Sequence, residues 1–255
     1  MIFKLALLLL GLTSWLRADD AADRLTAAGI IEFTAAYQAW DGGRFATAAD
    51  LFQQACIRVP DSSVNFYWLG AARFHRLLQL RSQPAADADA MAAAMDGALA
   101  ALETAVKLAG QDAESHALLG TLYGMKIDGS LLRAVRFGPS VAQHQKLALK
   151  FGADNARVRY LLGTGQFHTA GDEAARREAL GTLLAAEKLF AAEAKRPARR
   201  FEPRWGYSSC LTFIGRCYES LGPRTAAAVY YRRALTAHPA DHVAKAGLAR
   251  VTAGK

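Results

Sequence analysis

Five chemically distinctive residues near the start of the chain recur near its end at one fixed offset of 179 residues. The first set is Gly43, Ala48, Phe52, Ala55 and Pro60, and the second is Gly222, Ala227, Tyr231, Ala234 and Pro239. In each set a glycine interrupts the chain, a small–aromatic–small stripe follows at helical spacing, and a proline ends the helix. This repetition predicts a chain built from similar helical hairpins.

A second recurring signal is an aliphatic residue followed by glycine, at Leu69-Gly70, Leu119-Gly120, Leu162-Gly163 and Ile214-Gly215. Glycine is disfavoured inside a helix by about 1 kcal/mol, so we expect these glycines to allow close approach of a neighbouring helix. Tyr123 and Tyr218 stand three residues after their glycines. With these motifs the chain resembles the tetratricopeptide repeat family, whose 34-residue unit carries L-G-x2-Y on one helix and A-x3-F with a closing proline on the next.

The resemblance implies an all-α fold, a right-handed superhelical solenoid of about five antiparallel helix pairs with a C-terminal capping helix. It would cover residues 19–255, with units near 29–62, 63–112, 113–155, 156–207 and 208–241, and a cap over 242–253 that begins after Asp241 as N-cap. Extra residues interrupt the inner units at 81–89, at 129–140 with Gly138-Pro139, and at 195–204. Residues 154–163 also look like a stretch of uncharacterised exported bacterial proteins of this family.

Residues 1–18 are predicted to be an export signal. Lys4 precedes an apolar run from Leu5 to Leu16, and Ala18 offers a small residue for cleavage. As a helix the run would be about 18 Å long against roughly 30 Å of bilayer hydrocarbon, so a permanent span is disfavoured. An uncleaved anchor helix is the alternative. We therefore expect an exported protein, periplasmic or secreted, that touches the membrane only through the signal if it is uncleaved.

The cysteines and histidines do not form a disulfide framework or a metal site in the sequence pattern. Cys210 and Cys217 lie on one predicted helix, about 10 Å apart by helical rise, which is too far for a disulfide. Cys56 belongs to a distant helix, so we expect three buried or free thiols. Phosphate loops, nucleophile elbows and metal-ligand pairs are not found with the required spacing. The sequence thus predicts no enzyme, no catalytic residue, no metal and no cofactor.

Charge is distributed unevenly along the chain. The formal net charge is +8, and without Lys4 and Arg17 of the first eighteen residues it is 8 − 2 = +6. Residues 19–127 carry 8 basic and 13 acidic residues, whereas residues 128–255 carry 21 basic and 10 acidic ones. Such asymmetry favours an anionic or acidic partner, and it concerns association rather than fold.

In this family the first helix of each hairpin lines a concave face, so the resemblance implies a peptide groove along those helices. Large rings recur there at spacings of three and four, and they offer broad contact area to an extended or helical peptide. The predicted peptide-binding residues are Phe33, Tyr37, Trp40, Tyr67, Phe74, Tyr160, Phe167 and Arg216. The alternative is that these side chains pack against neighbouring helices or inserted segments.

His75 and His168 occupy equivalent places in two units, just after Phe74 and Phe167. They are either pH-sensitive contacts in one groove or structural histidines. The family's clamp of Lys, Asn and Arg for a peptide C-terminal carboxylate is not matched, because Tyr67 and Ala71 stand where the clamp would have Lys and Asn. Binding of cytosolic chaperone tails is therefore disfavoured.

The densest basic and aromatic segment is Lys195 to Tyr207, "KRPARRFEPRWGY". Its candidate anion-binding residues are Arg196, Arg199, Arg200 and Arg204, which could hold phosphate, carboxylate or a glycan surface. The alternative is a solvated linker whose arginines pair with Glu173, Glu178 or Glu187. Arg133, Arg136 and Phe137 repeat this composition more weakly. Nucleic acid is not expected as a partner, because export removes most such targets.

Taken together, these patterns predict a non-enzymatic scaffold or adaptor of the cell envelope that binds another protein or peptide in the groove of the repeat array. Two alternatives stay open. The chain could be a module that binds an anionic envelope polymer or a small molecule, or an accessory subunit of a transport or secretion system. Repeat folds host many functions, so the sequence names no ligand.

Overall fold

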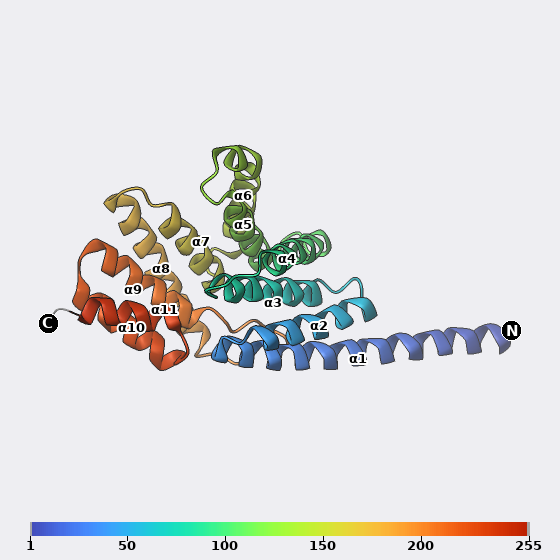
Figure 1. Ribbon diagram of the computed structural model, residues 1–255. Coiled ribbons are helices and arrows are strands. Elements are labelled where there is room, and N and C mark those ends of the chain that lie inside the picture. Colours follow the sequence, from blue (N-terminus) through green and yellow to red (C-terminus); the bar gives the residue numbers. More distant parts are fainter. Residues whose placement is uncertain (1, 254–255) are drawn as a thin grey trace. The chain divides into compact units, whose positions relative to one another are not determined.

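The computed structural model describes residues 2–253, with side chains from residue 20 onward. Within residues 2–253 the chain forms eleven helices and no strand (Figure 1). The side chains of the predicted export signal, residues 1–18, lie outside the described ones, so its cleavage stays a prediction. Among the residues searched, none of the helices combines the length and the apolar character that crossing a bilayer requires.

The chain divides into two compact units, of which the first comprises Met1–Tyr37 and Asp41–Gly110. Its helices are α1 (Ile2–Ala39), α2 (Gly42–Arg58), α3 (Ser63–Arg81) and α4 (Ala88–Leu108). Helix α3 packs against both α2 and α4. Aromatic rings fill the core: Trp68 of α3 stacks on Phe52 of α2 at 5.6 Å between ring centroids, and Phe33 of α1 meets Trp68 edge-on at 5.2 Å.

The second unit comprises Gln38–Trp40 and Gln111–Lys255. Its helices are α5 (Ala113–Ile127), α6 (Leu131–Gly152), α7 (Ala156–Thr169), α8 (Glu173–Glu193), α9 (Tyr207–Leu221), α10 (Arg224–Ala237) and α11 (His242–Thr252). Three hairpins follow one another, α5 with α6, α7 with α8, and α9 with α10. Helix α7 also packs against α5 and α9, and α11 packs against α9 and α10, so each hairpin covers the apolar side of the next.

Short polar side chains mark where the helices begin. The hydroxyl of Ser62 accepts a hydrogen bond from the backbone N–H of Asn65 at the start of α3. Asn155 accepts from the N–H groups of Arg157 and Val158 at the start of α7. These caps satisfy amide groups that have no partner inside the helix. The N-cap predicted at Asp241 is present, since its carboxylate accepts from the N–H of Ala244.

The aliphatic–glycine pairs do let helices approach closely, as expected. A Cβ atom at Gly70 would lie 2.4 Å from Leu102 Cγ, one at Gly163 would lie 2.7 Å from Leu183 Cγ, and one at Gly215 would lie 2.8 Å from the Tyr231 ring. Each pair joins the two helices of one hairpin, so the glycine sets how closely the hairpin closes. Gly120 is the exception, because a Cβ there would make ordinary contact, 3.4 Å from Gln145.

Two details differ from the sequence expectation. The first unit is expected to begin near residue 29, whereas helix α1 extends from Ile2 to Ala39 through Gly29, which packs against Phe52 as the other glycines pack in their hairpins. The segment 129–140 was expected to interrupt its hairpin at Gly138-Pro139. Instead the turn ends at Ser130, and Pro139 lies inside α6. Pro139 is exposed, so water can satisfy the carbonyl that loses its helical partner.

Candidate peptide-binding site on helices α7 and α9

Four of the predicted groove residues lie in the core. Phe33, Tyr67, Phe74 and Tyr160 are all buried. Phe33 contacts the rings of Phe45, Trp68 and His75, and Tyr160 contacts those of Phe190, Trp205 and Phe213. The packing interpretation describes these four side chains, because a buried ring offers no surface to a peptide.

Tyr37 and Trp40 are half-buried. Tyr37 lies at the edge of the first unit's aromatic core, with its ring centroid 6.3 Å from Phe33 and 5.4 Å from His75. Trp40 follows α1 in a left-handed backbone conformation, with φ of 55°, and its ring lies 6.1 Å from that of His242 in the second unit. Each ring therefore already has aromatic neighbours on one side.

The two histidines have different environments. His75 is buried, its Nδ1 lies 2.8 Å from the carbonyl oxygen of Ala71, and burial lowers its pKa to about 4. It is a structural histidine of the first unit's core. His168 is exposed at the end of α7, and its ring meets Phe213 edge-on at 5.6 Å.

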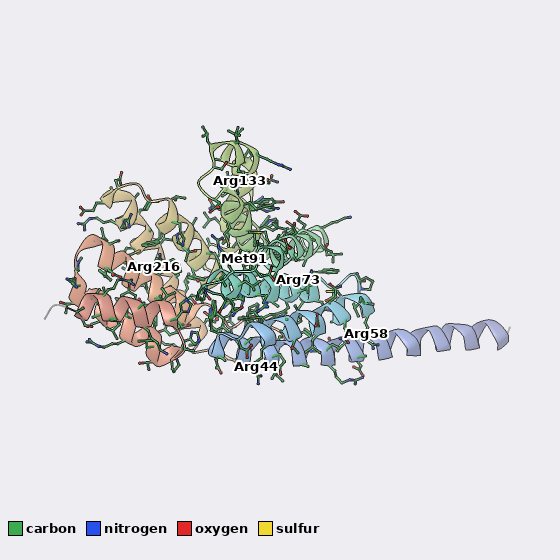
Figure 2. All side chains as sticks on the ribbon, viewed as in Figure 1. Arg44, Arg58, Arg73, Met91, Arg133 and Arg216 are labelled. Carbon is green, nitrogen blue, oxygen red and sulfur yellow. The ribbon has the colours of Figure 1, made fainter. Side chains whose placement is uncertain are left out.

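The remaining two predicted residues, Phe167 and Arg216, come together in the second unit. Phe167 near the end of α7 meets Phe213 of α9 edge-on, with 5.6 Å between ring centroids. The guanidinium carbon of Arg216 lies 4.5 Å from the centroid of Phe167 and 4.7 Å from that of Phe213. Arg216 thus rests on two phenyl rings, an arrangement favourable for a cation. Figure 2 labels Arg216 beside these helices.

Arg216 is a partly buried cation that has no hydrogen-bonded anion among the described residues. Burial is the main cause that lowers its pKa from the ordinary arginine value. Within residues 20–253 no carboxylate or carbonyl accepts a hydrogen bond from its guanidinium. Glu219, on the same helix, attracts Arg216 electrostatically, but its hydrogen bonds go to other groups: Arg250 Nε donates to it at 2.7 Å and the Tyr231 hydroxyl at 2.5 Å. Arg176 of α8 adds a second cation, 5.6 Å from the Phe167 ring.

Arg157, which sequence reasoning missed, holds the other end of α7. Its side chain is 2% exposed. Its Nε donates to Glu114 of α5 at 2.8 Å, its two terminal nitrogens donate to Glu193 of α8 at 3.0 and 2.6 Å, and Nη1 also reaches the carbonyl of Trp205 at 3.4 Å. One guanidinium therefore ties together three helices and the segment that precedes α9. The only sequence signal is an arginine at 157 inside the apolar start of a helix.

Two arginines of the basic segment 195–207, Arg196 and Arg204, are ion-paired with its one acidic residue, Glu202. Glu202 accepts hydrogen bonds from Arg196 at 2.9 Å, from Arg204 at 2.9 Å and from the backbone of Arg199 at 3.0 Å. These bonds, led by that from Arg196, lower the Glu202 pKa to about 2. Arg200 lies over the ring of Phe201. The segment is a linker with internal ion pairs.

The acidic residues expected to pair with this segment have other partners. Glu173 pairs with Arg177 and Glu187 with Arg233, while Glu178 accepts a hydrogen bond from Gln166. The linker interpretation describes Arg196 and Arg204, whose ion pairs are formed with Glu202 and Glu193, whereas the anion-binding role of Arg199 and Arg200, both exposed, stays a prediction.

Comparison with known proteins addresses the fold. No protein-family model matches the chain, and no curated protein sequence matches it. Among solved structures, a thermophilic TPR protein from Thermus thermophilus superposes with a TM-score of 0.64 at 17% sequence identity, covering 91% of this chain and 98% of that one. The fold is that of a tetratricopeptide repeat protein. The all-α helical-repeat architecture expected from the glycine and aromatic motifs is thereby confirmed.

Proposed function

We propose that this chain is a protein-interaction scaffold of the cell envelope that binds an acidic segment of another polypeptide on α7 and α9. The observation that carries the proposal is Arg216, half-buried on two phenyl rings and without a hydrogen-bonded or ion-paired carboxylate among the described residues. Partial burial removes water from the guanidinium, so an incoming carboxylate that hydrogen-bonds to it gains a charge-assisted ion pair.

The neighbours of Arg216 define what kind of ligand fits. Phe167 and Phe213 give an apolar floor, and Arg176 places a second positive charge beside Phe167. An Asp or Glu side chain next to an aliphatic or aromatic one matches this combination. The expectation of an envelope location depends on the export signal and remains part of the proposal, as does a non-enzymatic role. The alternative polymer-binding module loses two of its four candidate arginines, because Arg196 and Arg204 are already ion-paired.

The test uses peptides selected from a random display library on the full chain. We expect selected peptides to require an acidic residue, and replacement of that residue by its amide should weaken binding about tenfold or more in fluorescence polarisation. Arg216→Gln should weaken binding by a similar factor, and the two changes together should cost little more than either alone. Arg232→Gln on α10, an exposed arginine, is the matched control and should bind as the wild type does.

The outcome that contradicts this function is equally specific. If selected peptides bind Arg216→Gln and wild type with equal affinity, the site on α7 and α9 does not recognise them. If no peptide is selected under conditions where the chain is folded by circular dichroism, peptide binding itself is refuted. Arg216→Lys separates charge from geometry, because a lysine keeps the charge and loses the planar stacking on the rings.

A further inference from the structure

The N-terminal end of α6 carries a cluster of exposed aliphatic side chains. Leu131, Leu132 and Val135 are 80%, 84% and 73% exposed, more than any other large hydrophobic residue among those described. Of the 22 residues of α6, only Ala148 is buried. Single exposed aliphatic residues are ordinary, but three within five positions form a contiguous patch of the kind that marks an interaction surface.

The patch has a defined place around the helix. Successive residues of an α-helix are about 100° apart, so Leu131, Val135 and Leu132 fall within an arc of roughly 100°. Arg136 and Arg133 follow on the border of this arc, at roughly 40° and 100° beyond Leu132. The N-terminal turns of α6 thus have an outward apolar stripe with arginines along one edge. We call these five residues the α6 tip, and Figure 2 labels Arg133 within it.

The opposite side of the same turns packs against α5. Phe137 lies 6.1 Å from the ring of Tyr123, and the guanidinium of Arg136 lies 5.1 Å from the centroid of Phe137. The ring contacts fix the rotation of α6, so the aliphatic stripe faces away from its own hairpin. The residues inserted at 129–140, which the repeat pattern does not need, build this feature.

The charge around the α6 tip is positive. From residue 115 to residue 153 the chain has five basic residues and a single acidic one, Asp128. Arg133 donates to the backbone carbonyl of Lys126 at 3.5 Å, and Arg136 rests on Phe137. No carboxylate among the described residues pairs with Arg133 or Arg136. The apolar stripe is therefore bordered by cations available to an external anion.

We propose that the α6 tip docks on the surface of an anionic phospholipid bilayer. Leu131, Leu132 and Val135 would enter the layer between headgroups and acyl chains, while Arg133 and Arg136 meet lipid phosphates. The stripe is an exposed face of one helix, and a deformable lipid surface can bind such a face without a complementary pocket. Three aliphatic side chains and a few cations give weak, reversible and salt-sensitive attachment.

A local probe tests the proposal in the full chain, because the apolar segment before residue 18 would by itself bring the protein to vesicles. An environment-sensitive fluorophore on Val135→Cys reports the α6 tip, and one on Val229→Cys reports an exposed position of α10. The three native cysteines are buried, and burial raises their pKa values, to about 12 for Cys56 and about 11 for Cys217, so they label slowly in the folded protein.

With vesicles of phosphatidylglycerol and phosphatidylcholine, the probe at 135 should shift to the blue and be quenched by spin-labelled lipid. With pure phosphatidylcholine it should not, and the probe at 229 should stay in water in both cases. Each arginine near an anionic surface strengthens binding by about fivefold, so Arg133→Gln with Arg136→Gln should raise the lipid concentration for half-maximal shift by roughly 25-fold. Val229→Ser with Arg232→Gln is the matched control pair and should leave the titration unchanged.

Three results would overturn the proposal. The probe at 135 could stay in water while the protein sediments with anionic vesicles, which would assign binding to another segment. The shift could be equal on neutral vesicles or unaffected by the arginine pair, which would remove the role of lipid charge. Finally, the wild type could give no vesicle signal and sediment as a dimer that Leu131→Ser with Leu132→Ser abolishes. That result would make the patch an interface between copies of the chain.

Discussion

Replacing Arg157 with methionine should destabilise the second unit strongly, because it leaves two buried carboxylates without their shared cation. The Glu114 and Glu193 side chains are only 10% and 12% exposed. Removing one partner of a buried ion pair costs about 3–5 kcal/mol. Glu193 keeps Arg196 and Arg204 at 4.0 Å, whereas Glu114 keeps the amide of Asn155 at 2.7 Å. These remaining partners place the expected loss near the lower end, about 3 kcal/mol.

Urea unfolding followed by circular dichroism measures this loss. With a denaturant slope of about 3 kcal/mol/M, the midpoint of the second unit's transition should fall by about 1 M. Hydrogen exchange read by mass spectrometry shows where the loss occurs: amides of α5, α7 and α8 should exchange faster, while those of α2 to α4 should not change. Exchange is needed because two units need not unfold in a single step.

A second substitution separates lost charge pairing from lost packing. Adding Glu114→Gln to Arg157→Met removes one unpaired buried carboxylate, so the double variant should be more stable than Arg157→Met alone. In the wild-type background, Glu114→Gln should be destabilising, since it weakens the Arg157 pair. The reasoning is refuted if Arg157→Met costs less than about 1 kcal/mol, or if the two changes simply add.

Two further predictions follow from buried groups. The pKa of His75 falls from 6.5 in the unfolded chain to about 4 in the folded one, so the unfolded state binds more protons between these values and stability is lost as the pH falls through this window. Between pH 7 and pH 4 this loss amounts to about 3 kcal/mol of unfolding free energy. In urea titrations, His75→Leu should not show this pH-dependent loss of stability. If the unfolding free energy of both proteins has the same pH dependence, His75 is not the source of the loss. Gly163→Ala should destabilise by about 1–3 kcal/mol despite alanine's better helix propensity, because the new Cβ would lie 2.7 Å from Leu183 Cγ. Gly181→Ala in the partner helix α8, where a Cβ meets nothing within 4 Å, should instead stabilise by up to about 1 kcal/mol, and equal shifts of the urea midpoint in both variants would contradict the role of close approach.

The hairpin arrangement could be predicted because its signals are local and repeated. Within one hairpin a small residue lies opposite a large one, as Gly163 does with Leu183 and Gly215 with Tyr231. Both members of such a pair recur at fixed places in the repeat, so the sequence pattern predicts their contact. The N-cap at Asp241 likewise needs only neighbouring residues. The sequence places a break at Pro139, but a proline can lie inside a helix where that turn of the helix faces solvent. The sequence pattern alone does not tell which turns of α6 lie outside the core.

The site was harder to predict, because helices in an array are covered on more than one side. Tyr160 and Phe167, seven residues apart, share one side of α7, yet Tyr160 is buried against Trp205 and Phe167 stays half-exposed. Trp205, one of the rings that contact Tyr160, belongs to the inserted segment before α9, whose course is not encoded in the repeat. Arg157 was missed for a related reason: its partners Glu114 and Glu193 lie 43 and 36 residues away in the sequence.

The same helix connects these two features, which suggests why a costly buried ion network is kept. Arg157 lies in the first turn of α7 and Phe167 ten residues later, about 15 Å along the axis. The network fixes α7 against α5 and α8, and Gly163 lets it close on Leu183, so the ring of Phe167 is held beside Arg216 before any ligand arrives. A preformed site loses less entropy on binding than a mobile one. Arg157→Met should therefore weaken acidic-peptide binding even at temperatures where the variant is still folded. If peptide affinity is unchanged in that folded variant, the ion network serves stability alone and the geometry at Arg216 is maintained by α9.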